Sequence, residues 1–242
     1  MTTAAALLPT RKDEDFRYAD IESLARVWPV AVETMLLGEG EHRALSMVNM
    51  GVGELAIVLA PGASLDLHVL NAGQGYGRLS LRAELGAGSK FTFGAAQLAG
   101  RGQVLEVVTQ VAHLGPGAAS QQVVRSVAGG GSAANYLGKV HVAKGADGTD
   151  GSQSVRAMLL DRHSAANAKP ELEIFADDVK CAHGCAVGEL DASALFYMAQ
   201  RGLPPEMAKR LMLQAFLAEA FAGAEDQEAL LEQAVAALEA ML

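Results

Sequence analysis

Short spans in which apolar and polar residues alternate fill the middle of the chain, from about residue 45 to residue 187. Apolar side chains recur at every second position in three clear cases: Leu55, Ile57, Leu59; Leu65, Leu67, Val69; Leu79, Leu81, Ala83, Leu85. A period of two is typical of β-strands that bury one face and expose the other. The pattern therefore predicts a β-rich central domain.

Similar glycine-rich corners separate these spans, in the strings "APGASL", "GAGSKF" and "GPGAAS". They recur at intervals of 26 and then 29 residues, counted from Gly62 to Gly88 to Gly117. Strands on both sides of a repeated Gly corner predict an all-β solenoid of stacked coils. A β-sandwich with tight turns is the alternative, because it too has regularly spaced strands.

Different patterns flank this region, so we divide the chain into a helical docking segment (1–44), a β core (45–189) and an α-helical subdomain (190–242). In the first segment, Phe16, Ile21 and Leu24 have an irregular helical spacing, and Pro29 ends any helix before it. We expect this segment to pack on the β core.

The last segment has apolar residues at helical spacing and clear helix boundaries. Asp191 or Ser193 can cap a helix that ends at Gly202. Pro205 is suited to the first turn of a second helix, and a third is expected from about 226 to 241. These amphipathic helices either pack on one another or offer a docking surface to a partner.

Composition and charge narrow the function. The net charge is −9 and no Lys/Arg run is long enough to follow a phosphate backbone, so we expect no nucleic-acid binding. No apolar stretch approaches the ~20 residues of a membrane helix, and the N-terminal string "MTTAAALLPTRKDEDF" does not resemble a secretory signal. Two cysteines without such a signal suggest the reducing cytoplasm.

The string "DDVKCAHGC" contains both cysteines, Cys181 and Cys185, with His183 between them. On a strand these three side chains share one face, and the cysteines are ~13 Å apart, too far for a disulfide. A closed zinc site needs four ligands, so only an incomplete site is left, one that another surface completes. Thiolate and imidazole ligands suit iron or iron–sulfur chemistry. The alternative is a packing role for buried cysteines.

The longer string "KPELEIFADDVKCAHGCAVGELDASALFYMAQRGLPPEMAKRLMLQAF" closely resembles the SufB/SufD family of iron–sulfur cluster assembly proteins, and its SufD members in particular. The strings "PTRKDEDFRYADIESL", "HLGPGAASQQVVRSVAGGG" and "GKVHV" are also similar to family segments. The resemblance implies a right-handed parallel β-helix with helical flanks, in agreement with the solenoid prediction.

It further implies a non-catalytic scaffold of the SufB–SufC–SufD complex, which aids iron acquisition and assembles a transient iron–sulfur cluster shared with its partner. A SufB-like subunit would pair through the β-helix, with Cys181 and His183 at the interface. Cys185 stands where the family usually has a small residue, and is a candidate third ligand. Reduced flavin belongs to the family's assembled complex, and we expect no cofactor in the isolated chain.

A SufC-like ATPase would bind the C-terminal helices. Its expected contacts combine aromatic, apolar and turn residues: Phe196, Tyr197, Arg201, Gly202, Leu211, Phe216.

Two alternatives stay open at this point. One is a thiol enzyme in which a histidine such as His113 or His141 activates Cys181. The other is a β-helix that binds a second copy of itself in place of the SufB-like subunit.

Overall fold

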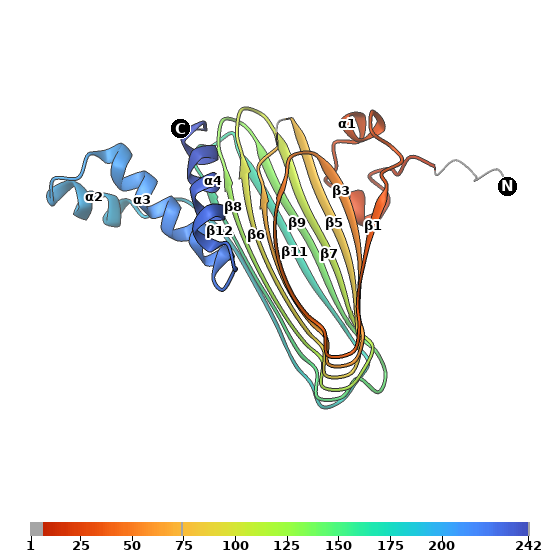
Figure 1. Cartoon of the computed structure of the whole chain (residues 1–242). Coiled ribbons are helices and arrows are strands. Elements are labelled where there is room, and N and C mark those ends of the chain that lie inside the picture. Colours follow the sequence, from red (N-terminus) through yellow and green to blue (C-terminus); the bar gives the residue numbers. More distant parts are fainter. Residues whose placement is uncertain (1–6, 74, 242) are drawn as a thin grey trace.

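The computed structural model describes residues 7–73 and 75–241 and shows a parallel β-helix with helices on two sides (Figure 1). Twelve strands form two six-stranded sheets, with the odd-numbered strands in one and the even-numbered strands in the other. The strands are β1 (Val32–Leu37), β2 (His42–Asn49), β3 (Val52–Leu59), β4 (Ser64–Asn71), β5 (Tyr76–Leu85), β6 (Lys90–Ala99), β7 (Val104–His113), β8 (Ala119–Ala128), β9 (Ala133–Val142), β10 (Asp150–Leu159), β11 (Ala165–Ile174) and β12 (Lys180–Gly188).

The strand pairs explain why the chain forms coils. Each strand pairs in parallel with the strand two positions along the chain, so Leu65 lies beside Phe91 and Leu81 beside Leu55. Equivalent apolar residues thereby stack between the two sheets and form the main core. The predicted solenoid is confirmed, and the all-parallel pairing excludes the sandwich.

The β-helix begins at Val32, earlier than the boundary expected at residue 45. The first strand, β1, pairs only with β3, and four of its six side chains are exposed. A strand with a single neighbour and little burial shows no clear alternation in sequence, which explains the difference. At the other end β12 stops at Gly188, beside the expected limit of residue 189.

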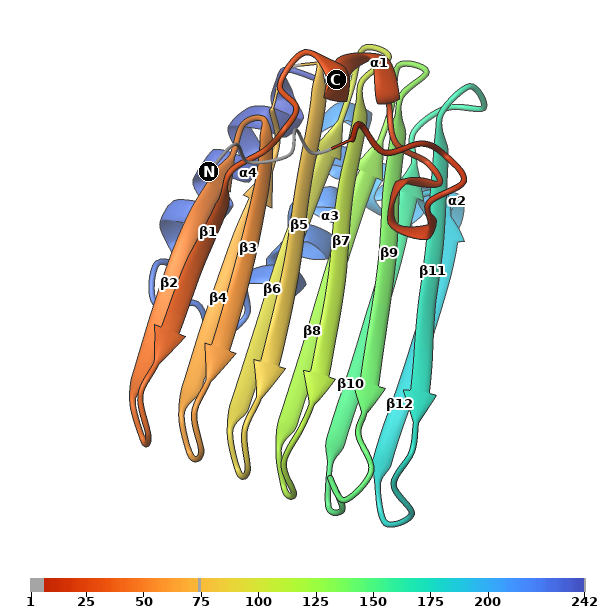
Figure 2. The ribbon, with the colours of Figure 1, turned by 90° about the vertical axis from the view of Figure 1, so that its right-hand side faces the viewer.

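The N-terminal segment crosses the outer face of the odd-numbered sheet (Figure 2). It contains the short helices η1 (Glu14–Phe16) and α1 (Ile21–Ala25), and Asp20 caps the second by accepting from the Ser23 N–H. Leu24 is buried against Tyr76, while the Gln110 side chain donates to Asp15 over 2.6 Å. The segment therefore contacts strands from several coils.

Arg78 joins this segment to a buried ion pair in the odd-numbered sheet. Its guanidinium lies 3.1 Å from the Glu106 carboxylate, donates to the Asp15 carbonyl over 2.8 Å, and stacks over the Phe16 ring. The Tyr76 hydroxyl donates to the same carboxylate over 2.5 Å. Because Arg78 and Glu106 are both buried, each depends on the other for its charge balance.

The C-terminal helices cover part of the even-numbered sheet. They are α2 (Ala192–Gln200), α3 (Pro205–Ala218), η2 (Glu219–Phe221) and α4 (Gln227–Glu239), here called the helical subdomain. Asp191 caps α2 as predicted, and Gly202 follows it with φ +85°. Leu213 and Phe221 are buried against Leu70 and neighbouring strand residues. None of the helices in the described part of the chain has the length and apolar character of a membrane span.

A close approach fixes the position of η2 on the sheet. A Cβ atom at Gly94 in β6 would lie 1.9 Å from the Ala220 carbonyl oxygen and 2.5 Å from the His68 ring. Only glycine leaves room for this backbone contact. In contrast, α2 has no buried residue and projects away from the β-helix (Figure 1).

Candidate functional site

The last coil of the β-helix carries the predicted cysteine and histidine residues. Its strands, β11 and β12, are the final members of their sheets, each with a neighbour on one side only. Figure 2 shows them at the opposite end of the stack from β1 and β2. We call this edge, formed by 165–174 and 180–188, the open end.

Cys181, His183 and Cys185 point toward the space between the two sheets. They pair in register with Gly151, Gln153 and Val155 of β10, which are buried between the sheets. Cys181 accordingly packs against Val140 and Val142 of the facing sheet. The three side chains share one face, as the period of two predicts, and because no further coil covers them His183 and Cys185 are exposed.

The same three residues also direct their backbone groups toward the open end. Lys180 donates its N–H to the Thr149 carbonyl of the coil behind. The backbone N–H and C=O groups of residues 181, 183, 185 and 187 therefore point outward from the sheet edge. An additional strand can therefore hydrogen-bond to β12 at the residues whose side chains form the candidate site.

The edge of β11 is less suited to pairing. Ala165 and Phe175 donate their N–H groups to the coil behind. The backbone N–H and C=O groups of the even-numbered residues of β11 therefore point toward the open end. Pro170 is one of them, and it has no N–H to offer. A strand that pairs at the open end therefore finds an uninterrupted row of donors on β12 and a broken row on β11.

The surroundings of Cys181 do not favour a thiol enzyme. Burial raises the pKa of the Cys181 thiol, which keeps it protonated. Burial lowers the pKa of His113 to about 4, and its Nε2 lies 2.8 Å from the Ser120 hydroxyl. No hydrogen bond joins His113 to Cys181 in the described residues, although a methyl group on Gly151 would lie within 4 Å of both side chains.

His141 is also unsuitable as an activating base. Its Nδ1 lies 3.1 Å from the Glu173 carboxylate, and its ring contacts Phe175. Positions 141 and 173 alternate with the buried Val140 and Val142, so this pair lies on the outer face of the sheet, away from Cys181.

The site is incomplete within one chain. Cys181 and Cys185 are both free thiols. Among residues 7–73 and 75–241, no three His, Cys, Asp or Glu side chains are grouped closely enough to hold a metal ion. The half-site predicted from the sequence, with further ligands supplied by a second surface, stays a prediction.

The chain matches the family model described as "SUF system FeS cluster assembly, SufBD core domain" over residues 43–216. This range covers most of the β-helix together with α2 and most of α3. The chain belongs to the SufB/SufD family.

Three curated proteins are similar to this chain, and the names of the first two agree with this assignment. The iron-sulfur cluster assembly protein SufD of Escherichia coli is 29% identical over 67% of this chain and 39% of its own length. An iron-sulfur cluster assembly SufBD family protein of Synechocystis is 37% identical over 50% of this chain and 27% of its own. Protein ABCI7, chloroplastic, of Arabidopsis thaliana is 36% identical over 48% and 25%, respectively. The chain thus spans between a quarter and two-fifths of the length of these three relatives.

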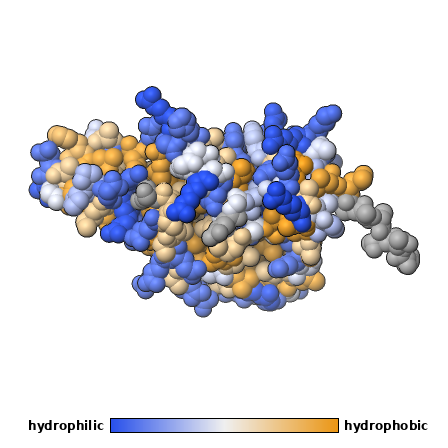
Figure 3. Space-filling view, turned by 90° about the horizontal axis from the view of Figure 1, so that it is seen from above, coloured by the Kyte–Doolittle hydropathy of each residue, from blue (hydrophilic) through white to orange (hydrophobic). Residues whose placement is uncertain are grey.

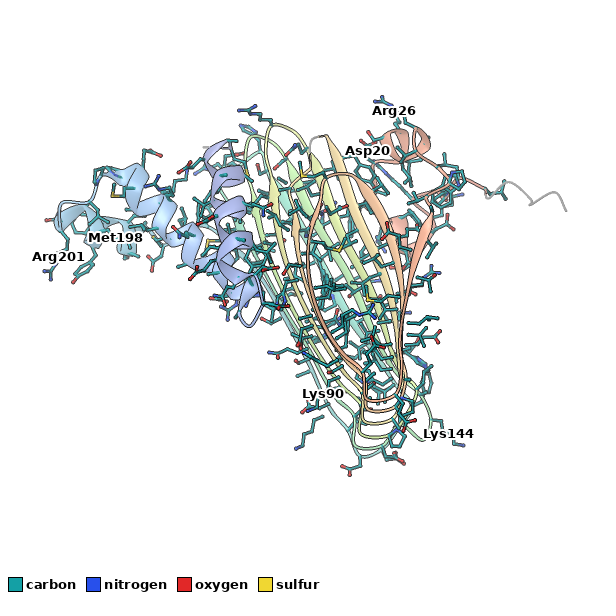
Figure 4. The ribbon with its side chains drawn as sticks, in the orientation of Figure 1. Asp20, Arg26, Lys90, Lys144, Met198 and Arg201 are labelled. Carbon is teal, nitrogen blue, oxygen red and sulfur yellow. The ribbon has the colours of Figure 1, made fainter. Side chains whose placement is uncertain are left out.

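The second set of predicted site residues lies on the projecting helices. Phe196 and Tyr197 of α2 are 67% and 59% exposed, and Leu211 of α3 is 42% exposed. Arg201 stacks over the Tyr197 ring at 5.1 Å, and Gly202 follows in the turn. Figure 4 places Arg201 and Met198 at the far tip of the helices, and Figure 3 shows hydrophobic residues on the surface of this lobe.

Phe216 differs from the others. It is only 7% exposed, because it packs with Leu213 and Leu217 against the even-numbered sheet. Because Phe216 is buried within the chain, the expectation that it contacts a partner does not hold. Helical periodicity alone cannot tell which apolar stripe of α3 meets the β-helix. Of the predicted set, the exposed side chains are Phe196, Tyr197, Leu211 and Arg201.

Sequence reasoning did not find Gln153 or Pro170. Gln153 becomes notable only when the register places it beside His183, and Pro170 only when the backbone directions along β11 are known. A signal for Gln153 did exist, since a glutamine at a strand position that alternates with Val155 and Ala157 is unusual for a buried face.

Proposed function

We propose that the chain is a SufD-like, non-catalytic scaffold subunit of a SufB–SufC–SufD complex for iron–sulfur cluster biogenesis. In this role it aids iron acquisition and holds part of a nascent cluster at its interface with a SufB-like subunit. Membership of the SufB/SufD family supports the assembly role. We place the complex in the cytoplasm.

One observation carries the proposal: Cys181, His183 and Cys185 present side chains and free backbone groups at the same open end. A SufB-like strand that pairs with β12 would cover the inner face of the last coil and bring its own ligands beside the thiol and imidazole. Such pairing needs no rearrangement of the coils behind it. The iron and sulfur that accumulate there are cargo, delivered to a site shared by two chains.

Within this site we assign Cys181 and His183 as the ligands. Cys181 is partly enclosed by Val140 and Val142, which excludes water from one side of the thiol. Cys185 lies two residues beyond His183 along the same face and is exposed, and we assign it only a supporting place as a third ligand.

The helical subdomain would bind a SufC-like ATPase through Phe196, Tyr197 and Leu211. Exposed aromatic side chains on a projecting helix form the kind of surface that is buried by a partner. Because α3 and α4 also pack on the β-helix, movement of the ATPase would be transmitted to the sheet that ends in β12.

The test is co-expression of the chain with candidate SufB-like and SufC-like proteins, followed by copurification and measurement of iron and sulfide. We expect a stable complex that accumulates both. His183→Ala should leave the complex intact and lower its iron and sulfide at least several-fold, whereas His163→Ala, at an exposed turn, should not. Cys185→Ala should have a much smaller effect than Cys181→Ala. Unchanged iron and sulfide in the His183→Ala complex would disprove the assigned site.

The docking surface has a separate test. Phe196→Ser together with Tyr197→Ser should abolish capture of the ATPase, whereas Phe175→Ser, at an exposed aromatic residue directly after β11, should not. A chain that forms only homodimers in these experiments, with no affinity for the SufB-like protein, would contradict the proposed pairing.

A further inference from the structure

Buried polar side chains form a connected group inside the last coils of the β-helix. The earlier coils are filled at this level by Leu67 and Phe93, whereas the next two coils of the same row have Gln122 and Gln153. Tyr136 faces them from the odd-numbered sheet, and its hydroxyl lies 3.0 Å from the Thr109 hydroxyl. The row continues to His183 at the open end.

Gln153 is only 2% exposed, and only the nitrogen of its side-chain amide has a hydrogen-bond partner in the described residues. Its Nε2 donates to the Tyr136 hydroxyl over 3.1 Å. Burial raises the pKa of Tyr136, so this hydroxyl stays protonated. The Gln153 Oε1 has no hydrogen-bond partner within the described residues. A buried carbonyl left without a donor is unfavourable, so a nearby donor able to reach it is favoured.

Two residues flank Gln153 in its row, Gln122 in the coil behind and His183 in the coil ahead. The Oε1 of Gln122 is fixed by the Thr109 hydroxyl at 2.7 Å and the Tyr136 hydroxyl at 3.3 Å. Its Nε2 also lacks a partner, and no hydrogen bond joins the two glutamines in the part of the chain that the structure describes. His183 is exposed and can turn, and adjacent strands are about 4.8 Å apart, within reach of an imidazole N–H.

We propose that Gln153 is a positioning residue for His183: its Oε1 accepts a hydrogen bond from an imidazole N–H and fixes the ring in one tautomer. The other ring nitrogen is then unprotonated and directed toward the open end, as a metal ligand requires. The role of that nitrogen in cluster assembly depends on the proposed function, but the hydrogen bond itself does not. Because Gln153 of the even-numbered sheet also donates to Tyr136 of the odd-numbered sheet, the His183 ring would be held by hydrogen bonds that connect to both sheets.

The test is NMR spectroscopy of the full chain labelled with ¹⁵N in its six histidines, with His183→Gln to assign the signal. We expect one imidazole N–H of His183 to be protected from exchange and to give a single-tautomer pattern. Gln153→Met, of similar size but without an acceptor, should abolish this signal. Gln122→Met, in the same row but not beside His183, should retain it, and Gln153→Glu should restore an acceptor and with it the protected N–H.

Two outcomes would overturn the proposal. One is an unprotected, mixed-tautomer His183 in the unaltered chain, which requires no variant to fold. The other is a protected N–H that persists in Gln153→Met. Neither depends on iron, sulfide or a partner, so failure here is distinguishable from failure of the assembly role.

Discussion

Arg125 of β8 and Glu219 of η2 form a 2.7 Å ion pair that connects the β-helix to the helical subdomain. Arg125 is almost fully buried, and it also donates to the Ser154 carbonyl over 2.8 Å. The carboxylate is about half exposed, so solvent weakens the attraction between the charges. The pair stabilises the fold mainly because the Glu219 carboxylate accepts hydrogen bonds from a guanidinium that has little access to water.

Arg125→Leu should therefore lower the free energy of unfolding by about 1–3 kcal/mol, because it removes hydrogen bonds to both structural units. Hydrogen exchange should increase in residues 205–239 more than in the β-helix. Arg156→Leu is the matched control, since Arg156 is exposed and lies 3.9 Å from the same carboxylate. Equal effects of the two substitutions would contradict the anchoring role of Arg125.

Gly94→Ala tests the contact between η2 and the sheet. The added methyl group would overlap the Ala220 carbonyl, so η2 must move, at a cost of about 1–3 kcal/mol. Thermal unfolding should show the loss, and the exposed ANS-binding surface should increase. Gly53→Ala, where a Cβ meets its nearest neighbour at 3.6 Å, should be tolerated.

Glu106→Gln should be strongly destabilising, by about 3–5 kcal/mol, because it leaves the buried Arg78 without a counter-charge. Urea unfolding measures the difference. Limited proteolysis should also show faster cleavage near Asp15 and Phe16, which Arg78 contacts. Arg82→Gln removes only an exposed partner 3.9 Å from Asp15, and a comparable loss there would refute this account.

The buried His113 makes stability depend on pH. An unfolded chain takes up the proton near pH 6.5, whereas burial lowers the pKa of the folded residue to about 4, against smaller opposing effects of a backbone hydrogen bond at Ala118 and the charge of Asp150. Protons therefore favour the unfolded state in this window, and about 3 kcal/mol of stability should be lost as the pH falls from 6.5 to 4. His113→Gln should flatten this part of the stability curve, and His163→Gln, at an exposed position, should leave it unchanged.

Local patterns predicted the parts of the fold that repeat. Alternation at Leu65, Leu67 and Val69 reflects a buried face with neighbours on both sides, and Asp191 caps α2 because capping depends on adjacent residues. Strand β1 and the first residues of β2 were missed as part of the β core, since an end strand has little burial to impose a pattern. Phe216 was misplaced because amphipathicity gives a face of a helix but not its neighbour.

The candidate site was predictable in composition but not in orientation. A period of two places Cys181, His183 and Cys185 on one face of any strand. That this face is the inner one, and that the strand ends its sheet, depends on how many coils precede it and on which sheet it joins. Gln153 and Pro170 owe their importance to the same long-range facts.

The single neighbour of β12 has a consequence for dynamics. In a stack of repeats, each unit is stabilised by its contacts with the units on either side, so a terminal unit held from one side separates at the lowest free energy. Amides of residues 180–188 should exchange with solvent by local fraying, while those of β6 and β8 exchange only when the whole stack unfolds. The strand that carries the cysteines and His183 is thus at an adaptable end of the β-helix, and capture of a partner strand would convert it from a frayed end into an interior coil.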